Sequence, residues 1–150
     1  MPSALSRKKA SWLNILIPSM YFIPVAAAFI LPKNFGFGYP QLVPAALSVG
    51  LAGLAVWIFG MINLGKSLAV LPGADRLVVR GIYKYVRHPI YIGIVFTILG
   101  LTVASGSAFG LASLIAVVIP LNIVRARFEE KALLRKFGKD YEAYKAKTLF

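Results

Sequence analysis

The sequence predicts an all-α membrane protein that crosses the bilayer about four times. Hydrophobic residues make up 59% of the 150 positions, charged residues make up 15%, and the mean hydropathy is +0.75. An ordinary soluble domain carries more charge and less apolar surface. Long uncharged intervals also alternate with short basic ones along the chain. We therefore expect two separate spans, a C-terminal helical hairpin and a cytosolic amphipathic C-terminal helix, all within one domain.

The residue types that are rare or missing exclude several kinds of site. The chain has no cysteine and a single histidine, His88. Disulfides, thiolate catalysis and a protein metal site are therefore not expected. The net charge of +12 could suit nucleic acid, but cations that flank apolar spans usually face anionic lipid headgroups. We expect membrane lipids as partners and no nucleic acid.

The first two spans are expected at residues 12–31 and 43–61. Each lies in an uncharged interval that is long enough to supply the roughly 20 apolar residues of a membrane crossing. The first also resembles a secretory signal, because basic residues at 7–9 precede it and Ala26-Ala27-Ala28 lies near its end; we favour a retained span. Small residues in the second would let another helix approach closely, namely Ala46, Gly50, Gly53 and Gly60.

A long uncharged interval at residues 88–124 predicts a helical hairpin. A single helix of that length would measure about 55 Å, well beyond the bilayer. Ser105-Gly106-Ser107, at the centre of the interval, is its best turn sequence. We expect helices at 89–104 and 108–124, with Pro89 in the first turn of one and Pro120 bending the other.

The tail at residues 125–150 is expected to lie on the cytosolic membrane surface. Its apolar residues recur at helical spacing, and Gly138 is placed to end the helix. Of the 17 cations, three precede the first span, five lie in the 66–87 loop, eight follow residue 124, and only Lys33 lies on the other side. The positive-inside rule then places both termini in the cytosol. The 66–87 loop, His88 and the tail would share one face of the membrane.

Two blocks of sequence suggest the chemistry. The first is Arg87-His88-Pro89-Ile90-Tyr91-Ile92-Gly93, preceded by Gly81-Ile82-Tyr83. The second runs from Arg125 through Glu129-Glu130 and Phe137-Gly138 to Tyr144. Together they resemble the signature of the isoprenylcysteine carboxyl methyltransferase and phospholipid methyltransferase superfamily, over about residues 63–148. The first two spans are similar to that family only in character.

The resemblance implies an enzyme that takes a methyl group from S-adenosylmethionine, held between the His-Pro turn and the C-terminal segment. Methyl transfer from a sulfonium is an in-line displacement, so the protein mainly orients the reactants and excludes water. The two glutamates could hold the ammonium or offset the cationic charge, while Arg87, His88 or a backbone N–H receives the carboxylate. The residues expected at the cofactor are Arg87, His88, Pro89, Tyr91, Gly93, Glu129 and Glu130.

The acceptor is expected to be lipid-like and to come from the bilayer. Both a prenylcysteine-type carboxylate and a lipid amine fit the resemblance. A carboxylate is already a nucleophile, so it needs only a cation such as Arg125 or Arg127 to place it. We expect Arg125 and Glu130 to act in catalysis. No residue in the sequence identifies the acceptor.

Simpler roles for these residues, and two other functions for the chain, compete with this interpretation. His88 could merely cap the following helix, and Glu129 and Glu130 could be solvated members of a charged helix. An NADPH-dependent membrane reductase of the sterol type is one alternative, because its C-terminal arrangement is distantly similar. A non-enzymatic membrane module is another, but it should carry polar residues along an interior path. Apart from Asn14, Asn122 and scattered hydroxyls, the spans carry none.

Overall fold

The computed structural model describes residues 16–31, 41–65 and 77–149, and these are helical almost throughout. Strand pairing in these ranges is limited to one bridge, between Val86 and Leu149. The predicted all-α class is confirmed. In chain order the elements are α2 (Phe22–Ile30), α3 (Leu42–Leu64), the 3₁₀ helix η2 (Gly81–Lys84), α4 (Pro89–Ala104), α5 (Ala108–Ser113), the π-helical turn η3 (Leu114–Val118), α6 (Ile119–Phe137) and α7 (Lys139–Lys147).

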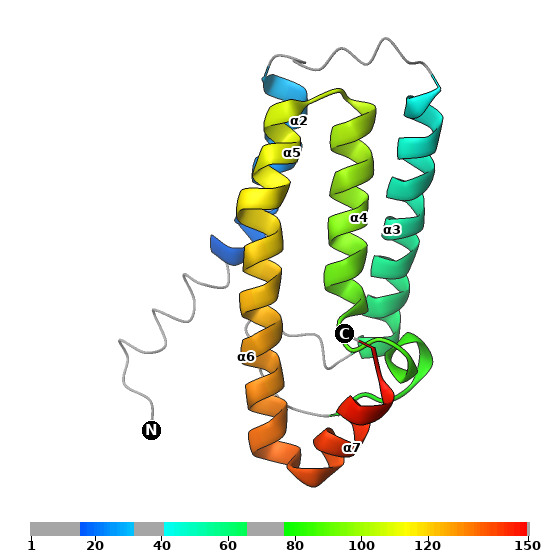
Figure 1. The fold of residues 1–150 in the computed structure, drawn as a ribbon, viewed down its shortest axis with the longest axis vertical. Coiled ribbons are helices and arrows are strands. Elements are labelled where there is room, and N and C mark those ends of the chain that lie inside the picture. Colours follow the sequence, from blue (N-terminus) through cyan, green and yellow to red (C-terminus); the bar gives the residue numbers. More distant parts are fainter. Residues whose placement is uncertain (1–15, 32–40, 66–76, 150) are drawn as a thin grey trace.

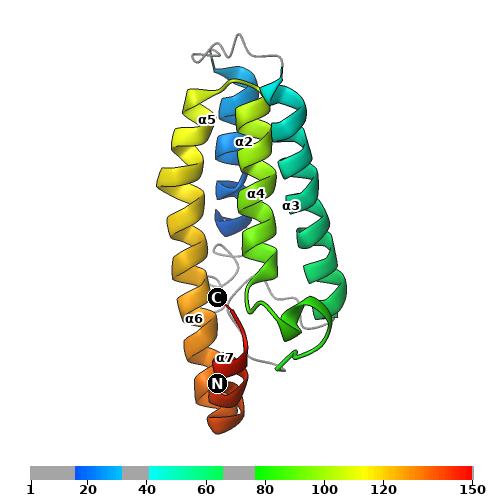
Figure 2. The same ribbon diagram turned by 45° about the vertical axis from the view of Figure 1, so that its right-hand side comes forward.

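Helix α4 lies in the middle of the bundle. α3 runs beside it on one side, α5 lies on the other, and α6 continues beyond the start of α4 to meet α7 (Figure 1). α2 packs against α5 and α4, as the turned view in Figure 2 also shows. The buried core joins Ile94 and Ile98 of α4 to Leu114 and Val118 of η3. This arrangement brings the start of α4 close to the polar end of α6.

Glycines bring the backbones of α3 and α4 together. A Cβ atom at Gly53 would lie 2.6 Å from the backbone nitrogen of Thr97, and one at Gly93 would lie 2.5 Å from that of Trp57. Gly100 faces the backbone of α3 in the same way. These separations are too short for any side chain, so the two helices can pack this closely only because the positions are glycine. The expected helix contact of the second span is confirmed, and its partner is α4.

The turn between α4 and α5 matches the sequence prediction. Gly106 has a φ of 68°, a left-handed conformation that glycine adopts without steric cost. The buried hydroxyl of Ser107 accepts a hydrogen bond from the Gly110 nitrogen at 3.0 Å and donates one to the Ala27 carbonyl at 3.3 Å. It therefore caps α5 and ties the turn to α2. The predicted helix at 89–104 coincides with α4.

The prediction ended the last helix of the hairpin at residue 124, whereas the helix continues to Phe137. The charged residues after Val124 keep a helical pattern, so only the uncharged, apolar sequence ends at Val124. The helix ends at Gly138, whose φ is 49°, as predicted. Pro120, which lacks a backbone N–H, is the second residue after the π turn η3.

The π turn keeps one side of this long helix in register with the core. Gly110, Leu114, Val118 and Asn122 are all buried and recur every four residues. In a regular α-helix each such step drifts by about 40° around the axis, so the buried side would rotate away from the core. The wider turn over Leu114–Val118 absorbs most of that drift. It thereby directs Asn122, and the polar turns after it, toward α2 and α4.

The outside of the bundle is apolar. In the most hydrophobic part of α3 only 11% is buried, and large side chains such as Leu51, Phe59 and Ile62 are exposed. An apolar surface of this extent is unfavourable in water and typical of a lipid-facing protein. Among the described residues two helices, Leu42–Leu64 and Ala108–Phe137, are long and apolar enough to cross a membrane, while Leu16–Ile30 and Pro89–Ala104 are apolar but shorter. The four crossings stay a prediction, and residues 12–15 of the first lie outside the described residues.

Candidate active site

His88 lies where the chain turns from η2 into α4. Pro89 occupies the first turn of α4, where its missing N–H costs no hydrogen bond, as predicted. His88 stands at the capping position of the helix, yet its side chain makes no capping hydrogen bond. The imidazole is only 7% exposed and is directed to α6 instead. The simple capping role considered from the sequence is therefore wrong.

Two carboxylates of α6 contact the imidazole. Nδ1 of His88 lies 3.5 Å from Oε2 of Glu129, and Nε2 lies 3.3 Å from Oε1 of Glu130. Consecutive residues of a helix point about 100° apart, so the ring fits between the two diverging side chains. The fold thus brings together the single histidine and the paired glutamates.

Glu130 is surrounded by cationic donors. The Nε of Arg87 donates to its Oε1 at 3.0 Å, and the Nζ of Lys145 donates to its Oε2 at 2.8 Å. Burial by itself would raise the pKa of Glu130, but the hydrogen bonds from Lys145 and His88 and the charges of Lys145 and Arg87 lower this pKa to about 2. Glu130 is therefore ionised at neutral pH and accepts hydrogen bonds only.

The guanidinium of Arg87 also holds the end of the chain. Its Nη1 donates to the carbonyl oxygens of Lys145 at 3.2 Å and Thr148 at 2.8 Å. Arg87 was one of three groups considered for the cofactor's carboxylate, beside His88 and a backbone N–H, and its Nε and Nη1 are used within the protein. A planar fork of donors suits this task better than a single ammonium would.

Backbone pairing completes this attachment. The nitrogen of Leu149 donates to the Tyr85 carbonyl at 2.8 Å, and the nitrogen of Arg87 donates to the Leu149 carbonyl at 3.1 Å. The Tyr144 hydroxyl donates to the Tyr83 carbonyl at 2.7 Å. We call residues 144–149, fastened to 83–87, the C-terminal clasp. The clasp fixes the segment that leads into His88.

Tyr91 and Arg125 extend the cluster toward the apolar core. The rings of His88 and Tyr91 are stacked, with centroids 5.6 Å apart, which confirms that these residues share one face of α4. The guanidinium carbon of Arg125 lies 5.4 Å from the centroid of the Tyr91 ring. A guanidinium over an aromatic face at this distance is a favourable cation–π contact. Of the residues predicted for the site, a continuous set is therefore in contact: His88, Tyr91, Arg125, Glu129, Glu130 and Arg87.

Two predicted residues face α3 instead. A Cβ atom at Gly93 would meet Trp57, and one at Gly60 would lie 3.6 Å from the Pro89 ring. Pro89 and Gly93 therefore pack between helices. Only their backbones could contact the cofactor, and that contact stays a prediction. Arg127, the other cation considered for the acceptor, is exposed.

Three residues of the cluster were not predicted from the sequence. Lys145 pairs with Glu130, while Tyr21 and Asn122 form hydrogen bonds that reach Arg125. An amide inside an apolar span could have marked Asn122 as a polar contact. Tyr21 resembles the many aromatic residues that lie at a membrane interface, and Lys145 lies in a tail rich in lysine. Neither residue therefore stands out in the sequence.

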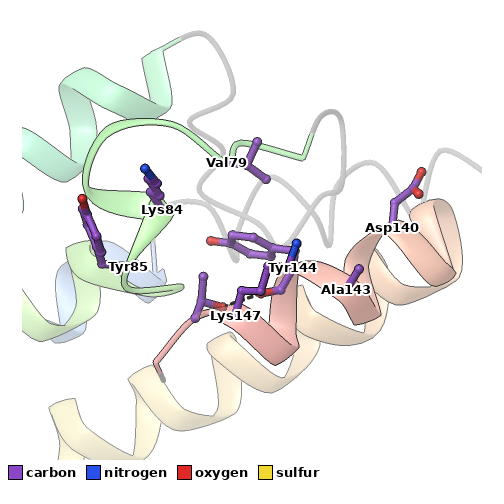
Figure 3. Close-up of a pocket in the computed structure, with 8 residues that line it drawn as sticks. Val79, Lys84, Tyr85, Asp140, Ala143, Tyr144 and Lys147 are labelled. Carbon is purple, nitrogen blue, oxygen red and sulfur yellow. Dashed lines mark hydrogen bonds between the residues drawn. The ribbon is translucent and has the colours of Figure 1, made fainter.

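A cavity lies between the two segments that the clasp joins. Its volume is about 470 Å³. Val79, Lys84 and Tyr85 line it on one side, and Asp140, Ala143, Tyr144 and Lys147 line it on the other (Figure 3). Thr148 also lines the cavity. His88, Glu129 and Glu130 do not line it. The cavity is therefore distinct from the cluster around His88.

The apolar exterior and the cluster at the start of α4 define a membrane protein with a site of paired carboxylates and cations beside a His-Pro turn. The family model described as phospholipid methyltransferase matches residues 41–140, and the chain belongs to this family. It is also similar to the protein-S-isoprenylcysteine O-methyltransferase of Schizosaccharomyces pombe, with 29% identity over 160 aligned positions that cover 96% of this chain and 67% of the relative. No solved structure matches the chain significantly. The resemblance drawn from the two sequence blocks is confirmed.

Proposed function

We propose that this protein is an integral membrane methyltransferase that uses S-adenosylmethionine to methylate a lipid-like acceptor. The observation that carries the proposal is the contact of His88 with Glu129 and Glu130, which lies inside the residues matched by the methyltransferase family. The apolar exterior supports a site reached from the bilayer. We further propose four crossings with both termini in the cytosol, as the distribution of cations favours.

The residues around Glu130 suit the charges of the cofactor. S-adenosylmethionine, when bound, supplies a methyl group on a positively charged sulfur and carries an ammonium and a carboxylate. Glu130 binds the ammonium of Lys145 at 2.8 Å, so this carboxylate can accept an ammonium, and the cofactor's ammonium would take the place of Lys145. Glu129 adds negative charge beside it. Because Nε and Nη1 of Arg87 are engaged and both ring nitrogens of His88 face the glutamates, a backbone N–H is the better partner for the carboxylate.

The position of Arg125 supports an anionic acceptor, such as the carboxylate of a prenylcysteine. It lies where the apolar part of the long helix ends, so an acceptor in the bilayer can place its tail among apolar side chains and its charged head beside the guanidinium. A carboxylate oxygen forms its bond to the methyl group as the methyl–sulfur bond breaks, and no proton has to move. The protonated head of a lipid amine would instead be repelled by Arg125.

Methyl transfer by purified protein in detergent tests the proposal. We would supply S-adenosylmethionine with a labelled methyl group, and compare S-farnesyl-N-acetylcysteine, phosphatidylethanolamine and S-methyl-N-acetylcysteine, which has no long tail. Label in the farnesylated acid alone is expected. Label in phosphatidylethanolamine would show that the acceptor group is an amine and not a carboxylate. Efficient labelling of the short acid would contradict a lipid-like acceptor. No transfer, together with tight binding of NADPH, would favour a reductase.

A further inference from the structure

We infer that Tyr21 is a positioning residue, which holds the guanidinium of Arg125 in the orientation that receives the anionic head of the acceptor. The inference rests on the proposed function, because it assigns Arg125 to the acceptor. Tyr21 lies outside the residues matched by the methyltransferase family, which begin at 41. The N-terminal helix would then contribute to the site as well as to the membrane-embedded scaffold.

The contacts of Tyr21 form a directed chain of hydrogen bonds. Nη1 of Arg125 donates to the Tyr21 hydroxyl at 3.2 Å, and the hydroxyl donates to Oδ1 of Asn122 at 2.6 Å. Nδ2 of Asn122 then donates to the carbonyl oxygen of Tyr91 at 3.3 Å. The hydroxyl accepts from a cation that can only donate, and the Asn122 amide accepts through Oδ1 and donates through Nδ2, so the orientation of the amide and of the hydroxyl proton is fixed.

The chain of hydrogen bonds is held by three different helices. Asn122 is 5% exposed and lies on the side of α6 that the π turn keeps facing the core. Tyr21 sits at the start of α2 and packs against the core around Ile94 and Ile98. Tyr91 belongs to α4 and lies beneath the guanidinium. Arg125 is thus held from the edge by Tyr21 and from the face by Tyr91.

This double support has a consequence for the reaction. An arginine side chain loses considerable rotamer freedom when it is fixed, and a site that has already fixed it need not do so when the acceptor binds. The Tyr21 hydroxyl forms hydrogen bonds with Arg125 and Asn122, and among the described residues it forms none with His88, Glu129 or Glu130, so we assign it no direct contact with the cofactor. Its removal should weaken use of the acceptor and leave use of the cofactor unchanged.

The variant Tyr21→Phe tests this directly, because it removes one hydroxyl and keeps the ring that packs against the core. With S-farnesyl-N-acetylcysteine as acceptor, we expect kcat/KM to fall about ten- to a hundred-fold, the range for loss of a hydrogen bond to a charged group. The affinity for S-adenosylmethionine, measured by calorimetry, and the thermal midpoint should stay at their wild-type values. Tyr85→Phe is the matched control, since this tyrosine is 64% exposed, and it should retain wild-type kcat/KM.

A double-mutant cycle separates positioning from a general effect on the fold. In an Arg125→Lys background the guanidinium is gone, so adding Tyr21→Phe should lower kcat/KM far less than it does in the wild type. An equal loss in both backgrounds, or a loss of cofactor affinity that matches the loss of acceptor use, would overturn the inference. So would wild-type kinetics in Tyr21→Phe. Absence of methyl transfer in the wild-type protein would instead refute the proposed function, so the two failures are distinguishable.

Discussion

The Nε2 atom of His88 lies 3.3 Å from a carboxylate oxygen of Glu130, although 42 positions separate the two residues. The hairpin of α4 and the long helix that follows it produces this contact. Because α4 begins at Pro89 while α6 extends past Val124, the polar turns of α6 lie level with the start of α4. A site that joins these two helices therefore depends on where the hairpin turns, at Gly106.

The first prediction concerns cofactor affinity. His88→Ala and Glu130→Gln should each weaken binding of S-adenosylmethionine about ten- to a hundred-fold, because loss of a charge-assisted contact costs about 1.5–3 kcal/mol. Calorimetry gives the affinities, and circular dichroism gives helical content and thermal midpoint. Glu142→Gln, on the exposed side of α7, is the control and should bind as wild type does. Wild-type affinity in both site variants would contradict the assignment, and additive losses in the double mutant would separate the two residues.

The second prediction concerns the clasp. Arg87→Lys keeps a positive charge near Glu130 but cannot donate to the Lys145 and Thr148 carbonyls in the same geometry. We expect faster amide hydrogen exchange at Leu149 and in α7, measured by mass spectrometry. Arg80→Lys, at an exposed arginine just before η2, should exchange as wild type does. If Leu149 stays equally protected in Arg87→Lys, the backbone pairing alone maintains the clasp.

The sequence predicted the helices and the meeting of the two motif blocks better than it predicted side-chain partners. The composition and the turn at Gly106 were sufficient for the hairpin, because both reflect local preferences. The partners of Arg87 were not predictable: a cation beside a cofactor motif suggests an anionic ligand, whereas its carbonyl partners come from backbone 58 and 61 positions away. Nothing in the pattern around Lys145 distinguishes it from the lysines beside it.

The end of the last span shows a related limit. The uncharged, apolar sequence ends at Val124, and the prediction placed the end of the helix there. The helical hydrogen bonds continue to Phe137, so the apolar sequence and the helix end at different residues. The π turn was not predicted either, because its effect on register becomes visible only when the core residues of α4 are known.

The third prediction concerns acid stability. The pKa of Glu130 is lowered from 4.5 to about 2 in the folded protein, so its ionised form stabilises the fold. This contribution is complete above about pH 4.5 and is lost as the pH falls through 2. The thermal midpoint of the wild type in detergent should therefore fall more steeply over this window than that of Glu130→Gln. Glu142→Gln should follow the wild-type curve, and parallel curves for the wild type and Glu130→Gln would contradict the prediction.

The fourth prediction concerns the contact between α3 and α4. Gly93→Ala places a Cβ atom 2.5 Å from the Trp57 nitrogen, so the helices must separate. Overpacking of this kind costs about 1–3 kcal/mol, and we expect a lower midpoint in denaturant titrations. Ala55→Val adds volume on the exposed side of α3 and should have little effect. Equal stability of Gly93→Ala and the wild type would show that the two helices have room for a Cβ atom at this position.

The last prediction concerns topology, and it follows from the cations: eight lie after residue 124, while none lies at 88–124. If the tail is cytosolic and the hairpin crosses the membrane twice, the turn at Gly106 lies on the outer side.

The protein has no cysteine, so single cysteines report one position each. Ser105→Cys, in the turn, should react with a membrane-impermeant maleimide in intact cells. Lys147→Cys, which is exposed in α7, should react only after permeabilisation. The unmodified protein should stay unlabelled in both conditions. Labelling of Lys147→Cys in intact cells would invert the topology, and protection of both positions would show that the hairpin does not reach the outer surface.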